Sequence, residues 1–147
     1  MTTKLHVPTP EERRERICTT VAQSRELVAA GIDPNTADMT WSHCQWTPAV
    51  TYGEDEYTLF AYPDAKTSHD PTGIPAWSAR ALMDILPATL PDPWNADNDC
   101  RLTVRRSGTS YEALYDGDDI SSYPVYVNAP TLITALTVLV LKVCGRR

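Results

Sequence analysis

Glycine is scarce in this sequence, and the residue patterns of common catalytic and metal sites are missing. The six glycines among 147 residues are scattered, so none of them forms a glycine-rich loop that could cradle a phosphate. The four cysteines contain no Cys-x-x-Cys pair and no spacing typical of zinc ligands; they are Cys18, Cys44, Cys100 and Cys144. We therefore assign no catalytic, cofactor-binding or metal-binding residue from the sequence.

Long hydrophobic runs are also missing. Residues 1–16 are polar and hold no apolar stretch of signal-peptide length. The most apolar segment, residues 129–141, is shorter than the ~20 residues that a helix needs to cross a bilayer. We therefore expect a cytoplasmic protein with no membrane contact, whose cysteines stay reduced. The length suits one hydrophobic core, which predicts a polar N-terminal tail over 1–16 and a single domain over 17–147.

Basic residues are outnumbered and unevenly distributed. The chain has 13 lysines and arginines against 19 acids, a net charge of −6. Residues 41–100 hold nine acids against Lys66 and Arg80, whereas residues 101–147 hold six bases against four acids. Nucleic-acid-binding proteins normally present a basic face, so we expect no nucleic-acid partner. The acidic middle third is instead the predicted contact with an unknown protein partner.

Two helices are predicted from residues that typically begin or end a helix. Thr20 and Gln23 have capping-box spacing, and Gly31 suits the left-handed conformation that often ends a helix. These residues predict a helix near 20–30. A second helix is predicted near 78–86, where apolar residues at helical spacing stop at a proline.

The third predicted helix, near 129–144, is the most apolar part of the chain. Asn128 is its predicted N-cap, Gly145 marks its end, and Lys142 is the only charge between them. A helix that is apolar on nearly every side must be covered by the rest of the protein or by a partner. We favour the core of a monomer over a homo-dimer contact. Five residues are therefore expected to be buried within one chain: Leu132, Ile133, Leu136, Leu139 and Val140.

The strands are predicted from alternation. Residues 101–106 alternate apolar with charged or polar side chains, and a strand at 111–115 can pair with them across the turn 107–110. This gives a hairpin over 101–115. Strands within 49–62 are predicted to join the same antiparallel sheet, and a further short strand is predicted at 123–127, before the last helix. Since the three helices would cover that sheet, the expected fold class is α+β.

Three patches of the sequence resemble a known family. Residues 24–39 read SRELVAAGIDPNTADM, residues 74–78 read IPAWS, and an Asn-capped helix closes the chain. In this order they are similar to an uncharacterised family of small proteins from Bacteroides-type gut bacteria and their phages or mobile elements. The resemblance implies an accessory protein of such an element, and it brings no known activity, cofactor or site residue with it.

The functional prediction rests on surfaces, because no motif carries chemistry. Trp77 is expected in the core at the start of a helix. The other tryptophans lie in irregular or extended segments, where they could anchor a partner; this predicted interaction surface consists of Trp41, Trp46 and Trp94. Our first hypothesis is therefore a non-enzymatic protein-interaction module.

Two alternatives stay open. A small enzyme or ligand-binding protein could use a pocket near His43, Cys44 and His69. A structural homo-oligomer could form if the terminal helices of several copies pack together. A concave pocket joining the histidines and the cysteine would favour chemistry, whereas a flat face bearing aromatic residues would favour binding.

Overall fold

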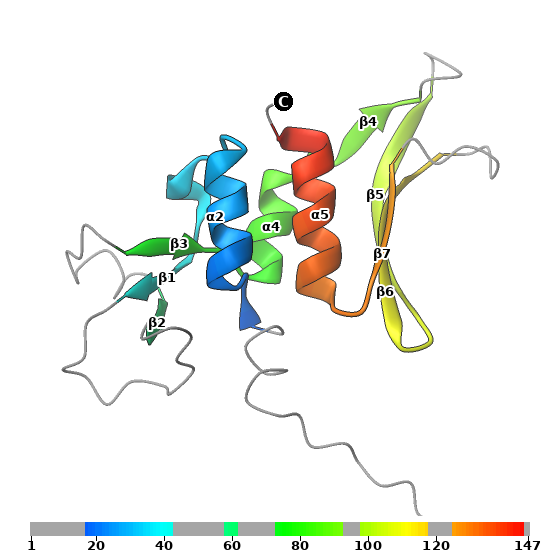
Figure 1. Ribbon diagram of the computed structural model, residues 1–147. Coiled ribbons are helices and arrows are strands. Elements are labelled where there is room, and N and C mark those ends of the chain that lie inside the picture. Colours follow the sequence, from blue (N-terminus) through cyan, green and yellow to red (C-terminus); the bar gives the residue numbers. More distant parts are fainter. Residues whose placement is uncertain (1–16, 43–57, 62–72, 93–97, 118–124, 146–147) are drawn as a thin grey trace, which may run out of the picture.

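A layer of helices stands between two antiparallel sheets, one of three strands and one of four strands (Figure 1). The computed structural model describes residues 17–42, 58–61, 73–92, 98–117 and 125–145. Predictions that fall elsewhere, such as the N-terminal tail, lie outside this part of the chain. The α+β fold class expected from the sequence is confirmed.

Helix α2, Val21–Ala29, has the ends that its capping residues predict. The Thr20 hydroxyl accepts a hydrogen bond from the Gln23 N–H at 3.1 Å, and Gln23 Oε1 accepts one from the Thr20 N–H at 3.0 Å. Beyond the helix, Gly31 has a φ of 90°. The predicted capping box and left-handed glycine are both confirmed. A short 3₁₀ turn, η1 (Pro34–Thr36), follows.

Helix α4, Ala79–Ile85, begins after a serine cap. The Ser78 hydroxyl accepts from the Ala81 N–H at 3.2 Å. The helix ends at Leu86, whose backbone is already extended. The helix predicted near 78–86 is confirmed.

The four-stranded sheet has the order β4-β5-β6-β7, and each neighbouring pair is antiparallel. Its strands are Thr89–Pro91 (β4), Asp99–Ser107 (β5), Ser110–Asp116 (β6) and Tyr126–Ala129 (β7). Strands β5 and β6 form the hairpin predicted over 101–115, in which Ser107 pairs with Ser110. Gly108 lies in the connection with a φ of 62°, a conformation that glycine adopts without strain.

The three-stranded sheet has the order β2-β1-β3, again antiparallel. Its strands are Met39–Ser42 (β1), Thr58–Ala61 (β2) and Ile74–Ala76 (β3). Strand β2 lies in the region 49–62, where strands were predicted, and the rest of that region is outside the described residues. The structure has two sheets where one was expected, because β1 pairs with β2 and β3 on its two sides while the hairpin pairs with β4 and β7.

Helix α5, Leu132–Cys144, begins later than predicted. Its N-cap is Thr131, whose hydroxyl accepts from the Thr134 N–H at 3.1 Å. The predicted cap, Asn128, instead belongs to strand β7 and lies opposite Glu112 of β6. The prediction was wrong because the strand continues past Asn128 before the helix starts. Among the residues that the structure describes, no helix is long and apolar enough to cross a membrane.

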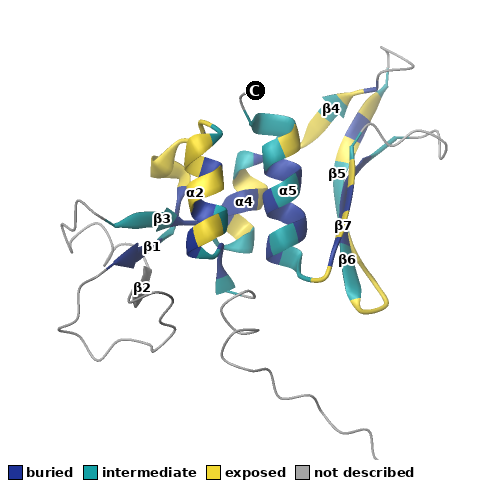
Figure 2. Ribbon diagram, viewed as in Figure 1, coloured by how far each residue is buried: buried dark blue, intermediate teal, exposed yellow. Residues whose placement is uncertain are grey.

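The main core lies between the helices and the inner face of the four-stranded sheet (Figure 2). Four of the five α5 residues expected to be buried are at most 1% exposed: Ile133, Leu136, Leu139 and Val140. Leu132 is only partly buried, because it occupies the first turn of the helix. Trp77 is fully buried in this core, as predicted.

A smaller cluster lies between the start of α2 and the three-stranded sheet. Its buried members are Cys18, Val21, Trp41 and Ala76. None of them belongs to the main core. The chain passes directly from one cluster to the other, since Ala76 belongs to the small cluster and the next residue, Trp77, belongs to the main core.

Candidate interaction surface

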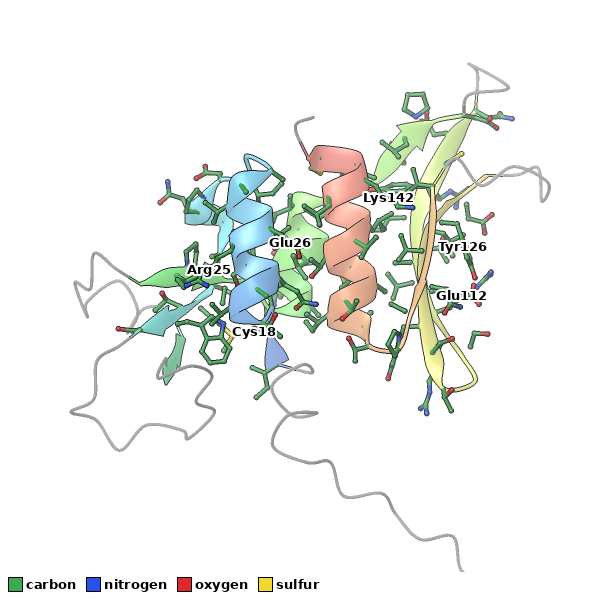
Figure 3. All side chains as sticks on the ribbon, in the orientation of Figure 1. Cys18, Arg25, Glu26, Glu112, Tyr126 and Lys142 are labelled. Atoms are coloured by element: carbon green, nitrogen blue, oxygen red, sulfur yellow. The ribbon has the colours of Figure 1, made fainter. Side chains whose placement is uncertain are left out.

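The side of the four-stranded sheet that faces away from the helices carries an ordered set of polar and aromatic side chains. Ala113 and Tyr115 of β6 point into the main core, so Glu112 and Leu114 point to the opposite side because strand side chains alternate. Figure 3 shows Glu112 and Tyr126 on this side of the sheet. We define the outer face by β6 and its paired neighbours: Thr103, Arg105, Glu112, Leu114, Tyr126 and Asn128. Arg105, Tyr126 and Asn128 are its exposed members, whereas Glu112 and Leu114 are buried.

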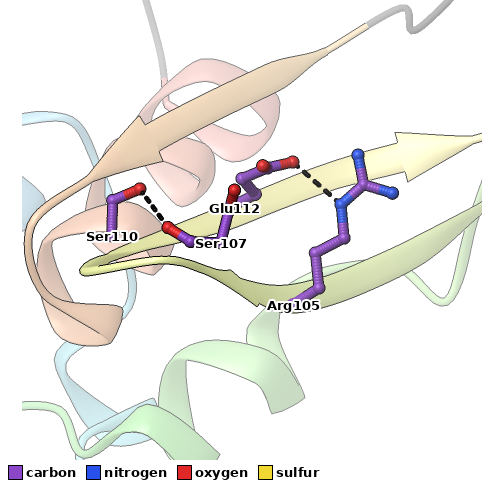
Figure 4. A network of polar contacts seen from close by, with 4 residues as sticks. All are labelled: Arg105, Ser107, Ser110 and Glu112. Atoms are coloured by element: carbon purple, nitrogen blue, oxygen red, sulfur yellow. Dashed lines mark hydrogen bonds and ion pairs between the residues drawn. The ribbon is translucent and has the colours of Figure 1, made fainter.

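The centre of the outer face is an ion pair set by the register of the hairpin. The short connection pairs Ser107 with Ser110, which places Arg105 directly opposite Glu112. Arg105 Nε donates to Glu112 Oε2 at 2.8 Å (Figure 4). The Glu112 side chain is 11% exposed and the Arg105 side chain is 47% exposed. The carboxylate is therefore enclosed, while part of the guanidinium remains at the surface.

The surroundings of Glu112 keep its carboxylate charged. The hydrogen bond from Arg105 lowers the pKa of Glu112, and partial burial opposes this shift. Hydrogen bonds from the side chains of Ser107 and Tyr126 lower the pKa of Glu112 further. A carboxylate that accepts several hydrogen bonds is stabilised in its ionised form. Glu112 is thus kept in its ionised form beside Arg105.

Tyr126 is the aromatic residue of the outer face. It is 41% exposed, which makes it one of the exposed large hydrophobic residues of the described chain. Its side-chain hydrogen bond to Glu112 fixes the phenol end, and its cross-strand neighbour is the fully buried Leu114. An aromatic ring whose hydroxyl is hydrogen-bonded loses less conformational freedom on binding a partner than an unrestrained ring does.

The hairpin beside the ion pair is closed by further hydrogen bonds. The Ser110 hydroxyl donates to the Ser107 carbonyl at 3.0 Å (Figure 4). Arg106 Nε donates to the Gly108 carbonyl at 3.2 Å. These bonds tie the tip of the hairpin to itself, so β5 and β6 present the outer face on a well-defined support.

Three of the four edge strands of the described sheets, β3, β4 and β7, are poorly suited to pairing with a further strand. Pro91 lies in β4, Pro75 lies in β3, and Pro130 directly follows β7. Proline lacks the N–H that a new strand would need, and it commonly protects sheet edges against unwanted pairing. We therefore expect a partner to bind the outer face rather than to pair with these edges.

The tryptophan surface predicted from the sequence is only partly within the described residues. Trp41 is fully buried in the small cluster, where its Nε1–H donates to the Thr19 carbonyl at 3.0 Å. It does not lie at the surface, because β1 turns its ring toward the start of α2. Trp46 and Trp94 lie outside the described residues, so their part of the prediction stays a prediction.

The alternative pocket also lies outside the described residues, since His43, Cys44 and His69 are all beyond them. Within the described ranges, no group of three or more histidine, cysteine or acidic side chains could hold a metal ion. No disulfide joins the three described cysteines, Cys18, Cys100 and Cys144.

Sequence reasoning missed the outer face, although its signals were present. Alternation along 111–115 places Glu112 on the side opposite to Tyr115, and pairing across the predicted turn places Arg105 opposite Glu112. The short strand predicted at 123–127 overlaps β7, but the sequence did not show that β7 pairs with β6 and so places Tyr126 on the outer face.

No protein-family model, curated protein or solved structure matches this chain. The resemblance to the family of small phage and mobile-element proteins therefore stays a prediction. The functional proposal rests on the residues of the chain itself.

Proposed function

We propose that this protein is a non-enzymatic interaction module that binds another protein through the outer face of its four-stranded sheet. The observation that carries the proposal is Tyr126, an exposed aromatic side chain held by a hydrogen bond to an enclosed and charged Glu112. The hydrogen bond restricts the orientation of the Tyr126 ring, and a restricted aromatic ring at the surface favours the binding of a protein partner.

The chemistry of the outer face suits a protein partner. Tyrosine and arginine are enriched among the residues that dominate the binding energy of protein interfaces, and the outer face carries Arg105 on β5 and Tyr126 on β7, on either side of β6. Nucleic acid is a poorer candidate, because the chain carries a net charge of −6 and phosphate binding requires a basic surface.

The size of the outer face indicates a transient complex. Strand β5 has nine residues, and four strands at ordinary spacing give a face of roughly 500 Å² at most. Stable complexes usually bury about 800 Å² on each partner. We therefore expect weak, reversible binding, unless other parts of the chain add contacts.

The test compares two residues of equal exposure on different surfaces. Tyr126 and Met83 of α4 are both 41% exposed, so Met83→Ala is a matched control for Tyr126→Ala. A photo-crosslinking amino acid at position 126 should capture a discrete protein from a lysate of the native host, and the same group at position 83 should not. Purified partner should then bind Tyr126→Ala at least ~10-fold more weakly and Met83→Ala normally. Equal capture at both positions, or equal binding by both variants, would reject the outer face as the contact.

A role as a phage or mobile-element accessory protein is compatible with this proposal and rests on the family resemblance alone. The partner identified by crosslinking is the direct test of that role. A host or phage protein would support it, whereas a substrate-like small molecule bound in place of a protein would favour the enzyme alternative.

A further inference from the structure

The small cluster is separated from the main core by a layer of buried polar groups. Thr19 and Ser24 are both fully buried, and their hydroxyl oxygens lie 2.8 Å apart in a hydrogen bond. Thr19 precedes α2, and Ser24 lies within α2 between Val21 of the small cluster and Leu27 of the main core. Apolar packing is therefore interrupted at this boundary, and directional hydrogen bonds replace it.

Thr19 is the centre of this polar layer. Its N–H donates to the Trp77 carbonyl at 2.9 Å, and its Oγ1 accepts from the Trp77 N–H at 3.1 Å. Its carbonyl accepts from Trp41 Nε1 at 3.0 Å. One residue thus connects Trp77 of the main core with Trp41 of the small cluster.

A second polar connection lies at the start of β1. The Asp38 carboxylate accepts from the Ser78 N–H at 2.9 Å and from the Ser78 hydroxyl. Trp77 Nε1 donates to Thr36 Oγ1 at 2.9 Å. Hydrogen bonds therefore join the segment before β1 to the start of α4, while β3 leads into α4 along the chain itself.

We propose that the three-stranded sheet and the small cluster open as one unit while the main core remains folded. A hydrogen bond contributes only about 0.5–1.5 kcal/mol net, because water replaces the lost partner when the bond breaks. Among the described residues, the small cluster has four buried apolar members and the main core has seventeen. Less apolar burial therefore holds the described part of the small cluster closed. Partial opening of the least stable unit is a general property of folded proteins. The opened form exposes Trp41, one of the residues predicted to contact a partner.

Native-state hydrogen exchange tests this opening. Strands β1 and β6 make a fair comparison, because each is a central strand with a neighbour on both sides. Amides of β1 should exchange at least ~10-fold faster than amides of β6, and their exchange should depend less on denaturant because less surface is exposed in the opening. Equal rates with equal denaturant dependence would show a single cooperative unit and would overturn the proposal.

Two threonine variants test whether Thr19 is the residue that holds the three-stranded sheet against the main core. Thr19→Val should speed the exchange of β1 by at least ~10-fold and leave β6 unchanged. Thr137→Val is the matched control, since Thr137 is equally buried but its hydroxyl donates at 2.7 Å to Ile133 within α5. It should leave the exchange of β1 unchanged. The proposal is rejected if Thr19→Val speeds both strands equally or prevents folding altogether. Thr19→Ser keeps the hydroxyl and should retain the wild-type difference between the strands.

Discussion

The two clusters of this protein are built in different ways. The main core surrounds α5 with the inner face of the four-stranded sheet and with α4, and its members are almost all apolar. Among the described residues of the small cluster, Trp41 is the one large aromatic side chain, and the cluster is bordered by the hydrogen-bonded Thr19 and Ser24. Burial of apolar side chains stabilises the fold in proportion to the area buried. Hydrogen bonds contribute less net stability, and because they are directional they mainly determine how the segments they join are oriented. The main core therefore determines whether the chain folds, and the polar layer determines where the three-stranded sheet attaches.

The main core should give the largest response to a single substitution. Leu136 of α5 is fully buried, so Leu136→Ala removes buried apolar surface and leaves a cavity. We expect a loss of about 2–5 kcal/mol in the free energy of unfolding, measured by urea denaturation. Lys142→Ala on the exposed side of the same helix should change it by less than about 0.5 kcal/mol. Similar losses for both variants would mean that α5 is not the centre of the core.

The turn after α2 gives the next largest effect. Gly31 has a φ of 90°, and the Ile32 N–H beyond it donates to the Leu27 carbonyl at 3.0 Å. Gly31→Val forces a β-branched residue into this conformation and should cost about 1–3 kcal/mol in thermal or urea unfolding. Gly31→Asn should cost less, because asparagine tolerates positive φ. A valine variant as stable as the wild type would show that the turn adopts another conformation.

The hydrogen bond of the buried Tyr115 hydroxyl should contribute measurably to the stability of the main core. Tyr115 donates its hydroxyl to the Pro87 carbonyl at 2.7 Å, and Tyr115→Phe should cost about 0.5–1.5 kcal/mol because that bond is lost. Denaturation curves of the two proteins at neutral pH measure this difference.

The raised pKa of Tyr115 should make the stability of the protein depend on pH in the alkaline range. Burial, with a smaller contribution from nearby Cys144, raises the pKa of Tyr115 from 10.0 to about 12. A raised pKa in the folded state adds stability below pH 10 that is lost as the pH rises from 10 through about 12. Ultraviolet titration should show one late-ionising tyrosine in the wild type that is missing from Tyr115→Phe. Its persistence in the variant would assign the signal to another residue.

The outer face should contribute least to stability, and its contribution should depend on pH. The pKa of Glu112 is held below its ordinary value of 4.5, first by the hydrogen bond from Arg105. A lowered pKa in the folded state adds stability above pH 4.5 that is lost as the pH falls through the folded-state pKa. The melting temperature of wild type should exceed that of Glu112→Gln at pH 7, and the gap should close below pH 4.5. A gap that is constant from pH 7 to pH 3 would count against the ion pair.

Much of the fold could be predicted where local chemistry determines structure. The Thr20 and Gln23 capping box, the positive φ of Gly31 and the hairpin around Gly108 all depend on residues close in sequence. The N-cap of α5 was misplaced because Asn128 is an equally good local candidate. Only its pairing with Glu112 shows that it belongs to a strand.

The features that could not be predicted depend on pairing between distant segments. The separation into two sheets follows from β1 pairing with β2 and β3, which alternation alone does not reveal. Burial of Trp41 follows from its bond to Thr19, a residue with no recognisable signal in the sequence. The candidate site could be predicted only in part. Arg105 and Glu112 follow from the hairpin register, and a strand was predicted around Tyr126, but the pairing of that strand with β6 could not be predicted.

Light scattering at micromolar concentration tests most directly the claim that α5 is enclosed within one chain. We expect the wild-type protein to have the monomer mass of 16.3 kDa. Leu136→Ala should have the same mass and a lower melting temperature, since its effect is on the core of a monomer. A wild-type mass twice as large, reduced to the monomer mass by Leu136→Ala, would contradict the account and identify α5 as the contact of a homo-dimer.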